Sequence, residues 1–161
     1  MASNRHLGRI IALQTLYEQD FRHECGDDGF DLKAVLARNI ARYDKTVDDR
    51  AFIKSLVNGV SKQTIQLDEL LQPLATEWPI SQIARMDRIV LRIGAYELSN
   101  GDNVPPKVVI NESVELAKAF GGENSSKFIN GVLGTLLKQI EAAEPSESNE
   151  HNEHNEQKKN T

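Results

Sequence analysis

The sequence predicts an all-α protein. Apolar residues recur at intervals of three and four along six stretches of the chain, which is the spacing that places them on one face of a helix. No stretch alternates apolar and polar residues with period two for long enough to predict a strand. The chain has 161 residues, 39% of them hydrophobic, which is enough for one domain with a substantial core.

Three helices are predicted in the first half, and they span about residues 4–21, 31–42 and 47–71. Ser3 or Asn4 can cap the first of them, because their side chains accept a bond from an unpaired backbone N–H. Asp48–Asp49 opens the third, where negative charge suits the N-terminal dipole. Pro73 and then Trp78–Pro79 interrupt the helical pattern, which indicates a boundary between two halves.

Three further helices are predicted in the second half, and they span about residues 81–98, 107–120 and 125–140. Gly121–Gly122 ends the middle one, because glycine adopts the left-handed C-terminal cap at little steric cost. Asn124, Ser125 or Ser126 can cap the last helix. In the first half, Gly59 is expected to permit close packing against another helix.

The last twenty residues differ in composition from the rest. Residues 142–161 have no apolar side chain after Ala143, which predicts a disordered acidic low-complexity tail behind a helical domain of residues 1–141. His151 and His154 could bind a metal weakly beside the glutamates, although a solvated tail is the simpler interpretation. Residues 144–159 carry five glutamates and two lysines, or −3 of the net charge of −5. The remaining −2 leaves room for a local basic patch that binds RNA.

Several classes of function lack their signatures. The lone Cys25 excludes an internal disulfide and a cysteine-rich zinc site, and fits a reducing cytoplasm. No run resembles a transmembrane helix or signal peptide, and no phosphate loop, dinucleotide fingerprint or serine nucleophile elbow occurs. Glu112 and Glu115 could share a helical face, but the other helices lack matching metal ligands. We therefore expect no enzyme, no cofactor and no metal.

Polar residues beside the apolar stripe of the last two helices allow two interpretations. Asn111, Lys127 and Asn130 lie next to this stripe, and Asn130 is followed by Gly131 inside a helix that neither residue favours. The structural interpretation is a close helix crossing at Gly131, with Asn130 bonded to a neighbouring backbone. The functional interpretation is a polar surface around Phe128 that meets a ligand.

Charged residues on two other helices are open in the same way. Arg5 and Arg9 are four apart and share a face of the first helix. They form either an ordinary solvated end or an arm that contacts phosphates. Asp87, Arg88 and Arg92 on the fourth helix are expected to be a solvated face with weak ion pairs.

Three segments together carry a resemblance to a known family: ALQTLY at 12–17, LRIGAYEL at 91–98 and VPPKVVINESVELAKAFGGENSSKFINGVL at 104–133. Over about residues 5–140 the chain resembles the NusB transcription antitermination and termination factors. The resemblance implies a compact bundle of six to seven helices in two subdomains, a cytoplasmic location and a non-enzymatic role.

The resemblance also implies partners. Family members pair with a small-subunit ribosomal protein called NusE, and the heterodimer binds single-stranded boxA RNA of nascent ribosomal RNA transcripts. Other Nus factors and RNA polymerase join them in a transcription elongation complex, so that the polymerase passes terminators. The free protein could also form a homodimer.

The positions that match the family's RNA surface are Arg5, Arg9, Gln14, Tyr17, Asn124, Lys127 and Phe128. Arginines would neutralise phosphates, while aromatic rings would stack on unpaired bases. Asp87 would meet the basic ribosomal partner. The family's arginine cluster is thinned here to Arg5 and Arg9, so RNA binding is expected to depend on the partner.

Two other functions remain in view. The first is a protein–protein scaffold of the same complex with little RNA affinity of its own. The second is a fragment of a ribosomal RNA methyltransferase, because some of these enzymes begin with the same helical domain. No methyltransferase domain follows Ile140, so this second alternative ranks last.

Overall fold

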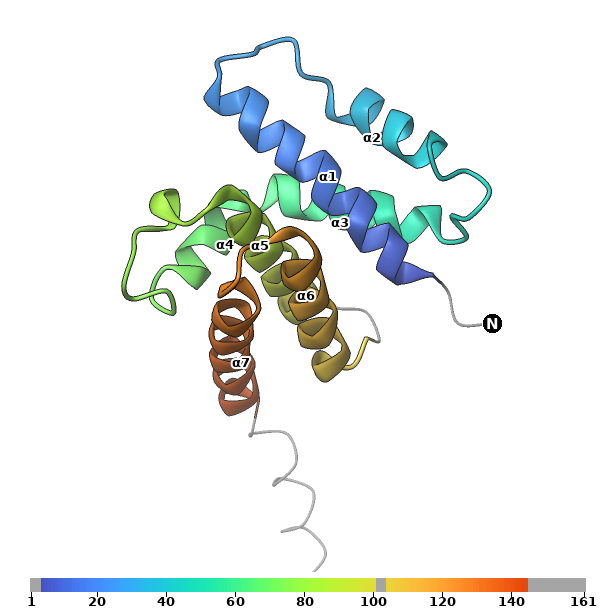
Figure 1. Cartoon of the computed structure of the whole chain (residues 1–161). Coiled ribbons are helices and arrows are strands. Elements are labelled where there is room, and N and C mark those ends of the chain that lie inside the picture. The colour runs from blue at the N-terminus through green and yellow to red at the C-terminus, as the bar shows by residue number, and fades with distance from the viewer. Residues whose placement is uncertain (1–3, 101–103, 145–161) are drawn as a thin grey trace, which may run out of the picture.

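The computed structural model describes residues 4–100 and 104–144, which form seven α-helices and one 3₁₀ turn (Figure 1). The first four helices are α1 (Arg5–Glu24), α2 (Leu32–Ala41), α3 (Arg50–Lys62) and α4 (Thr64–Leu71). After the 3₁₀ turn Ile80–Gln82 come α5 (Arg85–Asn100), α6 (Pro106–Phe120) and α7 (Ser125–Ala143). No strand occurs among the described residues, so the predicted all-α bundle of six to seven helices is confirmed.

Side-chain caps set the beginnings of three helices. The side-chain oxygens of Asn4, Asp31 and Asp49 each accept a hydrogen bond from a backbone N–H three residues later, at 3.3, 3.2 and 3.0 Å. These bonds satisfy donors that have no partner inside the helix. The helix starts near Asn4, Asp31 and Asp49 therefore follow from local sequence, as predicted.

The predicted third helix is instead two helices. Gln63, with φ −106° and ψ 16°, separates α3 from α4. The hydroxyl of Thr64 donates to the carbonyl oxygens of Val60 and Ser61, at 2.9 and 3.3 Å. Such a side-chain bond competes with the backbone ladder at this point. Apolar spacing continues across the break, and for this reason the periodicity alone predicted one helix.

Two boundaries in the second half also differ from the prediction. Helix α5 begins at Arg85 rather than near Ser81, because the 3₁₀ turn and an extended residue precede it. Gly121 is extended, with φ −89° and ψ −170°, and is not a left-handed cap. Glycine is needed there for a close approach, since a Cβ would lie 2.6 Å from the Ser125 side chain and 2.7 Å from the Ala117 carbonyl oxygen.

The expected cap of α7 is also different. Asn124 occupies the capping position but makes no side-chain capping bond. The Ser125 hydroxyl accepts a hydrogen bond from the N–H of Gly122 at 2.8 Å, and so it fastens the preceding turn onto the helix.

Helix α5 lies at the centre of the bundle. It packs against α1, α3 and α4 on one side and against α6 and α7 on the other (Figure 1). Buried residues from both halves form one apolar cluster, which includes Leu13 of α1, Leu56 of α3, Leu91 of α5 and Leu133 of α7. The halves on either side of the proline-rich segment at 73–79 therefore share a core.

Glycines show which helices approach each other closely. A Cβ on Gly59 of α3 would lie 2.2 Å from the ring of Tyr96 on α5, which agrees with the close packing predicted there. A Cβ on Gly94 would lie 2.6 Å from the buried Leu133. At Gly131 nothing lies within 4 Å of such a Cβ, so of the two interpretations the structural one, a close helix crossing at this residue, is wrong.

The C-terminal boundary and the tail are only partly described. Helix α7 continues through Ala143, and residues 145–161, including His151 and His154, lie outside the described residues. The described helices include none that could span a bilayer. Within the same residues, no cluster of three or more histidine, cysteine or carboxylate side chains could hold a metal ion.

Candidate nucleic-acid interface

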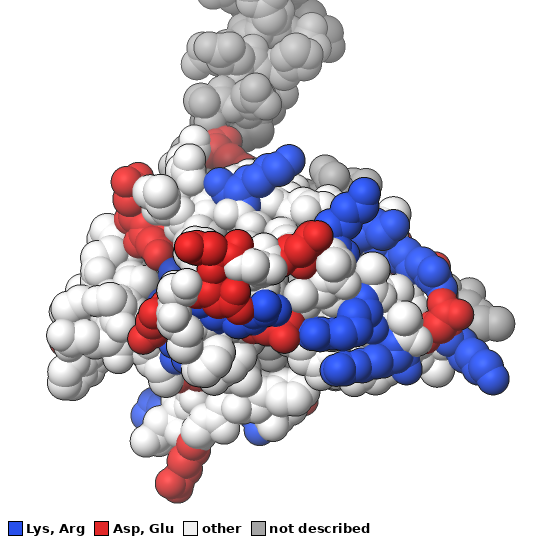
Figure 2. Space-filling model, turned by 90° about the horizontal axis from the view of Figure 1, so that it is seen from above, with Lys and Arg blue, Asp and Glu red and all other residues white. Residues whose placement is uncertain are grey.

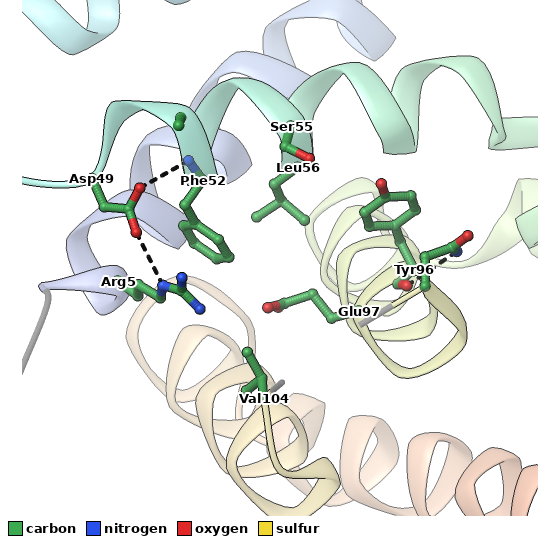
Figure 3. Close-up of a pocket in the computed structure, with 10 residues that line it drawn as sticks. Arg5, Asp49, Phe52, Ser55, Leu56, Tyr96, Glu97 and Val104 are labelled. Atoms are coloured by element: carbon green, nitrogen blue, oxygen red, sulfur yellow. Dashed lines mark hydrogen bonds and ion pairs between the residues drawn. The ribbon is translucent and has the colours of Figure 1, made fainter. Parts of the chain in front are cut away.

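Arg5 lies at the beginning of α1, beside a pocket bordered by α3 and α5 (Figure 3). Its guanidinium carbon is 4.6 Å from the centroid of the Phe52 ring, and its Nε is 3.3 Å from Oδ2 of Asp49. The other oxygen of Asp49 caps α3, so this carboxylate is itself fixed. The Arg5 side chain is 37% exposed, and it therefore presents an oriented positive charge at the surface.

Arg9 is buried, in contrast to the sequence-based expectation of a phosphate contact. It is 3% exposed, and it forms a bidentate ion pair with Glu97 of α5, at 2.9 and 2.7 Å. Glu112 of α6 lies 3.8 Å from its third nitrogen. Breaking this pair would leave Glu97 buried without a partner, which is costly. In this conformation the Arg9 side chain is therefore not accessible to a phosphate.

Three predicted site residues lie within about one turn at the beginning of α7, with Asn124 at the capping position. Asn124 and Lys127 are exposed, whereas Phe128 is half-buried. Among the described residues Lys127 has no carboxylate partner within 4 Å. These residues combine a free positive charge with an aromatic surface.

Phe128 lines two adjoining pockets between α7 and the segment that precedes α5. The first, which we call the Lys127 pocket, has a volume of about 260 Å³ and is lined by residues 74–78, Ile83, Lys127, Phe128, Gly131 and Val132. The second, the Asp87 pocket, has a volume of about 520 Å³ and is lined by residues 77–78, 82–84, Asp87, Gly122, Asn124, Ser125 and Phe128.

Asp87 lies in the first turn of α5, where the helix dipole favours a carboxylate. Its Oδ1 is buried, and it accepts no hydrogen bond from the described part of the chain. Buried acceptors are normally satisfied, because an unmade bond to a desolvated oxygen is costly. Asp87 also lines the Asp87 pocket, so a basic group of another molecule can approach this residue there.

Comparison with known proteins identifies the family. A family model described as the NusB family matches residues 6–138. The chain belongs to the NusB family. It is 41% identical over 140 residues to the transcription antitermination protein NusB of Dehalococcoides mccartyi, covering 87% of this chain and 94% of the relative. It is 40% identical to the NusB of Chloroflexus aggregans, covering 85% and 89%.

Solved NusB structures have the same fold. NusB of T. maritima is 30% identical, with a TM-score of 0.75 over 86% of this chain and 94% of that chain. A second structure, titled as the antitermination factors NusB and NusE in complex with dsRNA, is 24% identical and has a TM-score of 0.74. It covers 86% of this chain and 99% of its own, and at this identity the likeness concerns the fold.

The structure of this NusB-family chain places its predicted RNA residues in separate groups. Arg5 faces the pocket beside α3, while Asn124, Lys127 and Phe128 share the beginning of α7. Tyr17 lies twelve residues after Arg5, about 18 Å farther along α1. Its ring centroid is 5.6 Å from the guanidinium carbon of Arg85.

Two of these residues are neither free nor fully buried. Gln14 and Tyr17 are half-buried on α1. Arg85 is the first residue of α5, so Tyr17 lies beside the beginning of that helix. Within the described residues, no hydrogen bond or ion pair joins Arg5 to the group on α7.

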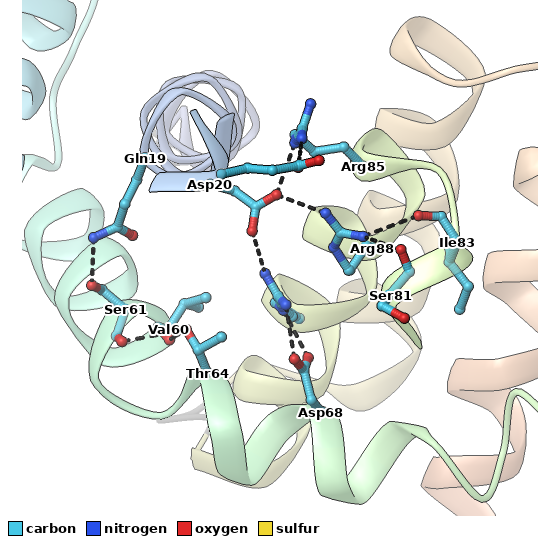
Figure 4. A network of polar contacts seen from close by, with 12 residues as sticks. Gln19, Asp20, Val60, Ser61, Thr64, Asp68, Ser81, Ile83, Arg85 and Arg88 are labelled. Carbon is cyan, nitrogen blue, oxygen red and sulfur yellow. Dashed lines mark hydrogen bonds and ion pairs between the residues drawn. The ribbon is translucent and has the colours of Figure 1, made fainter. Parts of the chain in front are cut away.

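Sequence reasoning missed a network around Asp20 of α1 (Figure 4). The Asp20 carboxylate accepts hydrogen bonds from Arg85, Arg88 and Arg92 of α5 at 2.8, 2.7 and 3.3 Å. Arg92 also forms a bidentate pair with Asp68 of α4, at 2.8 Å for both bonds. The expectation of a solvated charged face is wrong for Arg88 and Arg92, because their side chains are only 10% and 9% exposed.

Burial and charge act against each other on the ionisation of this network. Burial alone would raise the pKa of Asp20, but the hydrogen bonds and charges of the three arginines outweigh it and hold that pKa below its ordinary value. Burial likewise disfavours the Arg92 cation, yet Asp68 and Asp20 raise its pKa. The network stays charged and joins α1, α4 and α5. Arginines four apart within an apolar run were the signal for it in the sequence.

The surface around α1 and α2 carries charges of both signs. In Figure 2, which looks down on these two helices, lysine and arginine gather toward one side and acidic residues are interspersed toward the other. No continuous basic field covers this face. The described part of this face therefore lacks the extended positive surface that would hold RNA by charge alone.

Proposed function

We propose that this chain is a cytoplasmic transcription antitermination and termination factor that pairs with the ribosomal protein NusE and binds boxA-type RNA of nascent ribosomal RNA transcripts. Its membership of the NusB family supports this function, since the relatives at 41% and 40% identity are named transcription antitermination proteins. The structure titled as NusB and NusE with dsRNA, which shares the fold, supports both partners. Within the elongation complex the heterodimer acts with RNA polymerase and other Nus factors.

The observation that carries the RNA part of the proposal is the surface at the beginning of α7. Lys127 is exposed and has no ion-pair partner among the described residues, and the half-buried Phe128 follows it directly. A lysine can neutralise a phosphate while the ring packs against an unstacked base. Asn124 adds a polar side chain within the same turn of helix.

The Asp87 pocket supports the protein part. Asp87 and a second acidic residue, Glu77, line it, and no basic side chain does. A basic partner such as a ribosomal protein can supply the missing cation. RNA is poorly suited to this pocket because its phosphates would face two carboxylates.

Arg9 takes a different role from the one expected. Held by Glu97 and close to Glu112, it positions the beginning of α1 against α5 and α6. Arg5 and Tyr17 remain proposed RNA contacts, and the half-buried Gln14 adds hydrogen-bonding capacity between them.

The burial of Arg9 also favours the alternative function, a scaffold of the same complex with little RNA affinity. It leaves Arg5 as the exposed arginine at the beginning of α1, where each lost phosphate contact lowers affinity. The ribosomal partner would then have to supply most of the positive charge.

A matched pair of lysine variants tests the RNA surface. Lys127→Ala should weaken binding of a fluorescein-labelled boxA-type RNA to the complex with NusE, and should reduce the salt slope by about one unit. Lys138→Ala is the control, because Lys138 is exposed on the same side of α7 about 16 Å farther along. Equal affinities and salt slopes for the two variants would remove Lys127 from the interface. A duplex of the same sequence, measured in parallel, distinguishes recognition of single strands from recognition of double-stranded RNA.

A further inference from the structure

Trp78 is a large apolar side chain that the core does not use. It is 60% exposed, although the residues on both sides of its segment, Ala75 and Ile80, are buried. The indole lines both the Lys127 pocket and the Asp87 pocket. An exposed tryptophan beside two pockets indicates a contact surface, because exposure of so large an apolar side chain to water is unfavourable.

The backbone around Trp78 is fixed. The side-chain amide of Gln72 donates to the carbonyl oxygen of Trp78 at 3.2 Å and accepts from the N–H of Ile80 at 2.9 Å. Pro79 between them has its φ restricted by its ring. One glutamine thus holds the chain on both sides of the indole, so little backbone freedom remains to be lost when a ligand binds.

The Lys127 pocket has the chemistry of a base-stacking site. Trp78 and Phe128 supply aromatic walls, Ile83 and Val132 supply apolar surface, and Lys127 supplies a positive charge at the edge. Aromatic side chains that alternate with cations are the usual means of holding single-stranded nucleic acid. Glu77 lines both pockets, but the Asp87 pocket adds a second carboxylate and has no lysine, so it suits a basic protein.

Gly131 keeps the Lys127 pocket open. It lies inside α7, where glycine is unfavourable, and nothing lies within 4 Å of the position that its Cβ would occupy. Close packing does not explain the residue, since no helix crosses there. Any larger side chain at this position would extend into the pocket that Gly131 lines.

We propose that Trp78 and Phe128 form a stacking site for one unpaired RNA base in the Lys127 pocket, with Lys127 on the adjoining phosphate and Gly131 leaving room for the base. This inference rests on the proposed function and adds a base-binding position and the residue Trp78 to it. Trp78 and Gly131 thereby become determinants of RNA affinity.

The chain contains one tryptophan, so its emission reports directly on this site. An unlabelled boxA-type single-stranded RNA is titrated into the full chain, alone and in complex with NusE, and a stacked base is expected to quench the emission of Trp78. The Trp78→Phe variant has no tryptophan, so its emission at the tryptophan wavelength measures the contribution of NusE, which is subtracted. Its phenylalanine ring can still stack on a base. It should retain most of the RNA affinity.

Two variants remove the stacking site in different ways. Trp78→Ala deletes one wall, and Gly131→Leu fills the pocket with a residue that favours a helix. Each should weaken binding of fluorescein-labelled RNA to the complex by about 5- to 150-fold, as expected for the loss of one stacked base. Gly134→Leu is the matched control, because Gly134 lies in the same helix, has open space around it and does not line the pocket. Ile65→Ala controls for loss of an exposed apolar side chain elsewhere.

The outcomes separate this inference from the proposed function. The stacking site is supported if RNA quenches the emission, if Trp78→Ala and Gly131→Leu both weaken RNA binding, and if the two control variants do not. Unchanged RNA affinity in both variants, with unchanged emission, overturns the stacking site while the proposed function stands. Emission that responds to NusE without RNA, with both variants impaired only in NusE binding, also overturns it and assigns Trp78 to the protein interface. A wild-type complex that binds no RNA overturns the proposed function and the stacking site together.

Discussion

Arg5 and Arg9 are four residues apart on α1 and yet have different surroundings. Both lie over the Phe52 ring, with guanidinium carbons 4.6 and 5.1 Å from its centroid. Arg5 remains 37% exposed, whereas Arg9 is 3% exposed and held by both oxygens of Glu97. The difference arises from a contact 88 residues away in the sequence, which no local pattern reveals. At the scale of single residues, the ion-pair partner therefore decides whether an arginine is available to a ligand or stabilises the fold.

Arg9→Ala should therefore act mainly on stability. The change leaves the Glu97 carboxylate buried without its partner, so the free energy of unfolding should fall by about 3–5 kcal/mol. Replacing both residues by apolar ones, as in Arg9→Met with Glu97→Leu, should recover much of the loss. Chemical denaturation followed by circular dichroism measures both. Unchanged stability with a smaller salt slope of RNA binding would instead make Arg9 the phosphate contact expected from the sequence.

Asp20→Asn should destabilise the protein at neutral pH by about 2–4 kcal/mol, because three arginines lose a charged acceptor. The pKa of Asp20 is lowered in the folded protein, so its contribution is present above the unfolded pKa of about 3.9 and disappears as the pH falls through the folded value. The stability difference between wild type and variant should thus be constant from pH 6 to 8 and shrink below about pH 4. Denaturation at several pH values tests this. The exposed Glu69→Gln should show no comparable loss at pH 7, and an equal loss there would contradict the account.

At the scale of helices, local chemistry was predictable and long-range packing was not. The caps at Asn4, Asp31 and Asp49 depend on neighbours three residues away, and these helix starts were predicted correctly. At the break at Gln63 the Thr64 hydroxyl bonds to the carbonyl oxygens of the preceding turn, and apolar periodicity does not detect such side-chain bonds.

The candidate site was predictable to a similar extent. The group at the beginning of α7 comes from one continuous segment, so Asn124, Lys127 and Phe128 could be grouped from sequence. The place of Trp78 beside Phe128 depends on how the segment before α5 packs against α7, and sequence did not reveal it.

Glycines in the helices should respond in opposite directions to substitution by alanine. Gly94→Ala should destabilise the protein by about 1–3 kcal/mol, since its Cβ would meet the buried Leu133 at 2.6 Å. Gly134→Ala should stabilise it by about 0.5–1 kcal/mol, because the site is open and alanine favours the helix. Thermal and chemical unfolding measure both. Destabilisation by Gly134→Ala of the same size as for Gly94→Ala would refute the packing described for α5 and α7.

At the scale of the molecule, α5 is the central helix against which the helices of both halves pack. The Asp20 network and the Arg9–Glu97 pair fasten α1 to α5, and the core continues from there to α6 and α7. Positive charge at the candidate RNA surface is sparse, consisting mainly of Arg5 and Lys127. Acidic groups instead face the Asp87 pocket. We therefore expect the chain to hold RNA tightly only together with a basic partner.

The measurement that tests this account most directly is the binding of labelled boxA-type RNA at 50 and 200 mM salt, with and without NusE. We expect weak binding by the chain alone, and tight binding by the complex that falls steeply as salt increases, because both proteins then contribute cations to the phosphates. Tight binding without NusE would contradict the dependence on the partner. A stable protein complex that binds no RNA at either salt concentration would contradict the RNA-binding function and favour the scaffold.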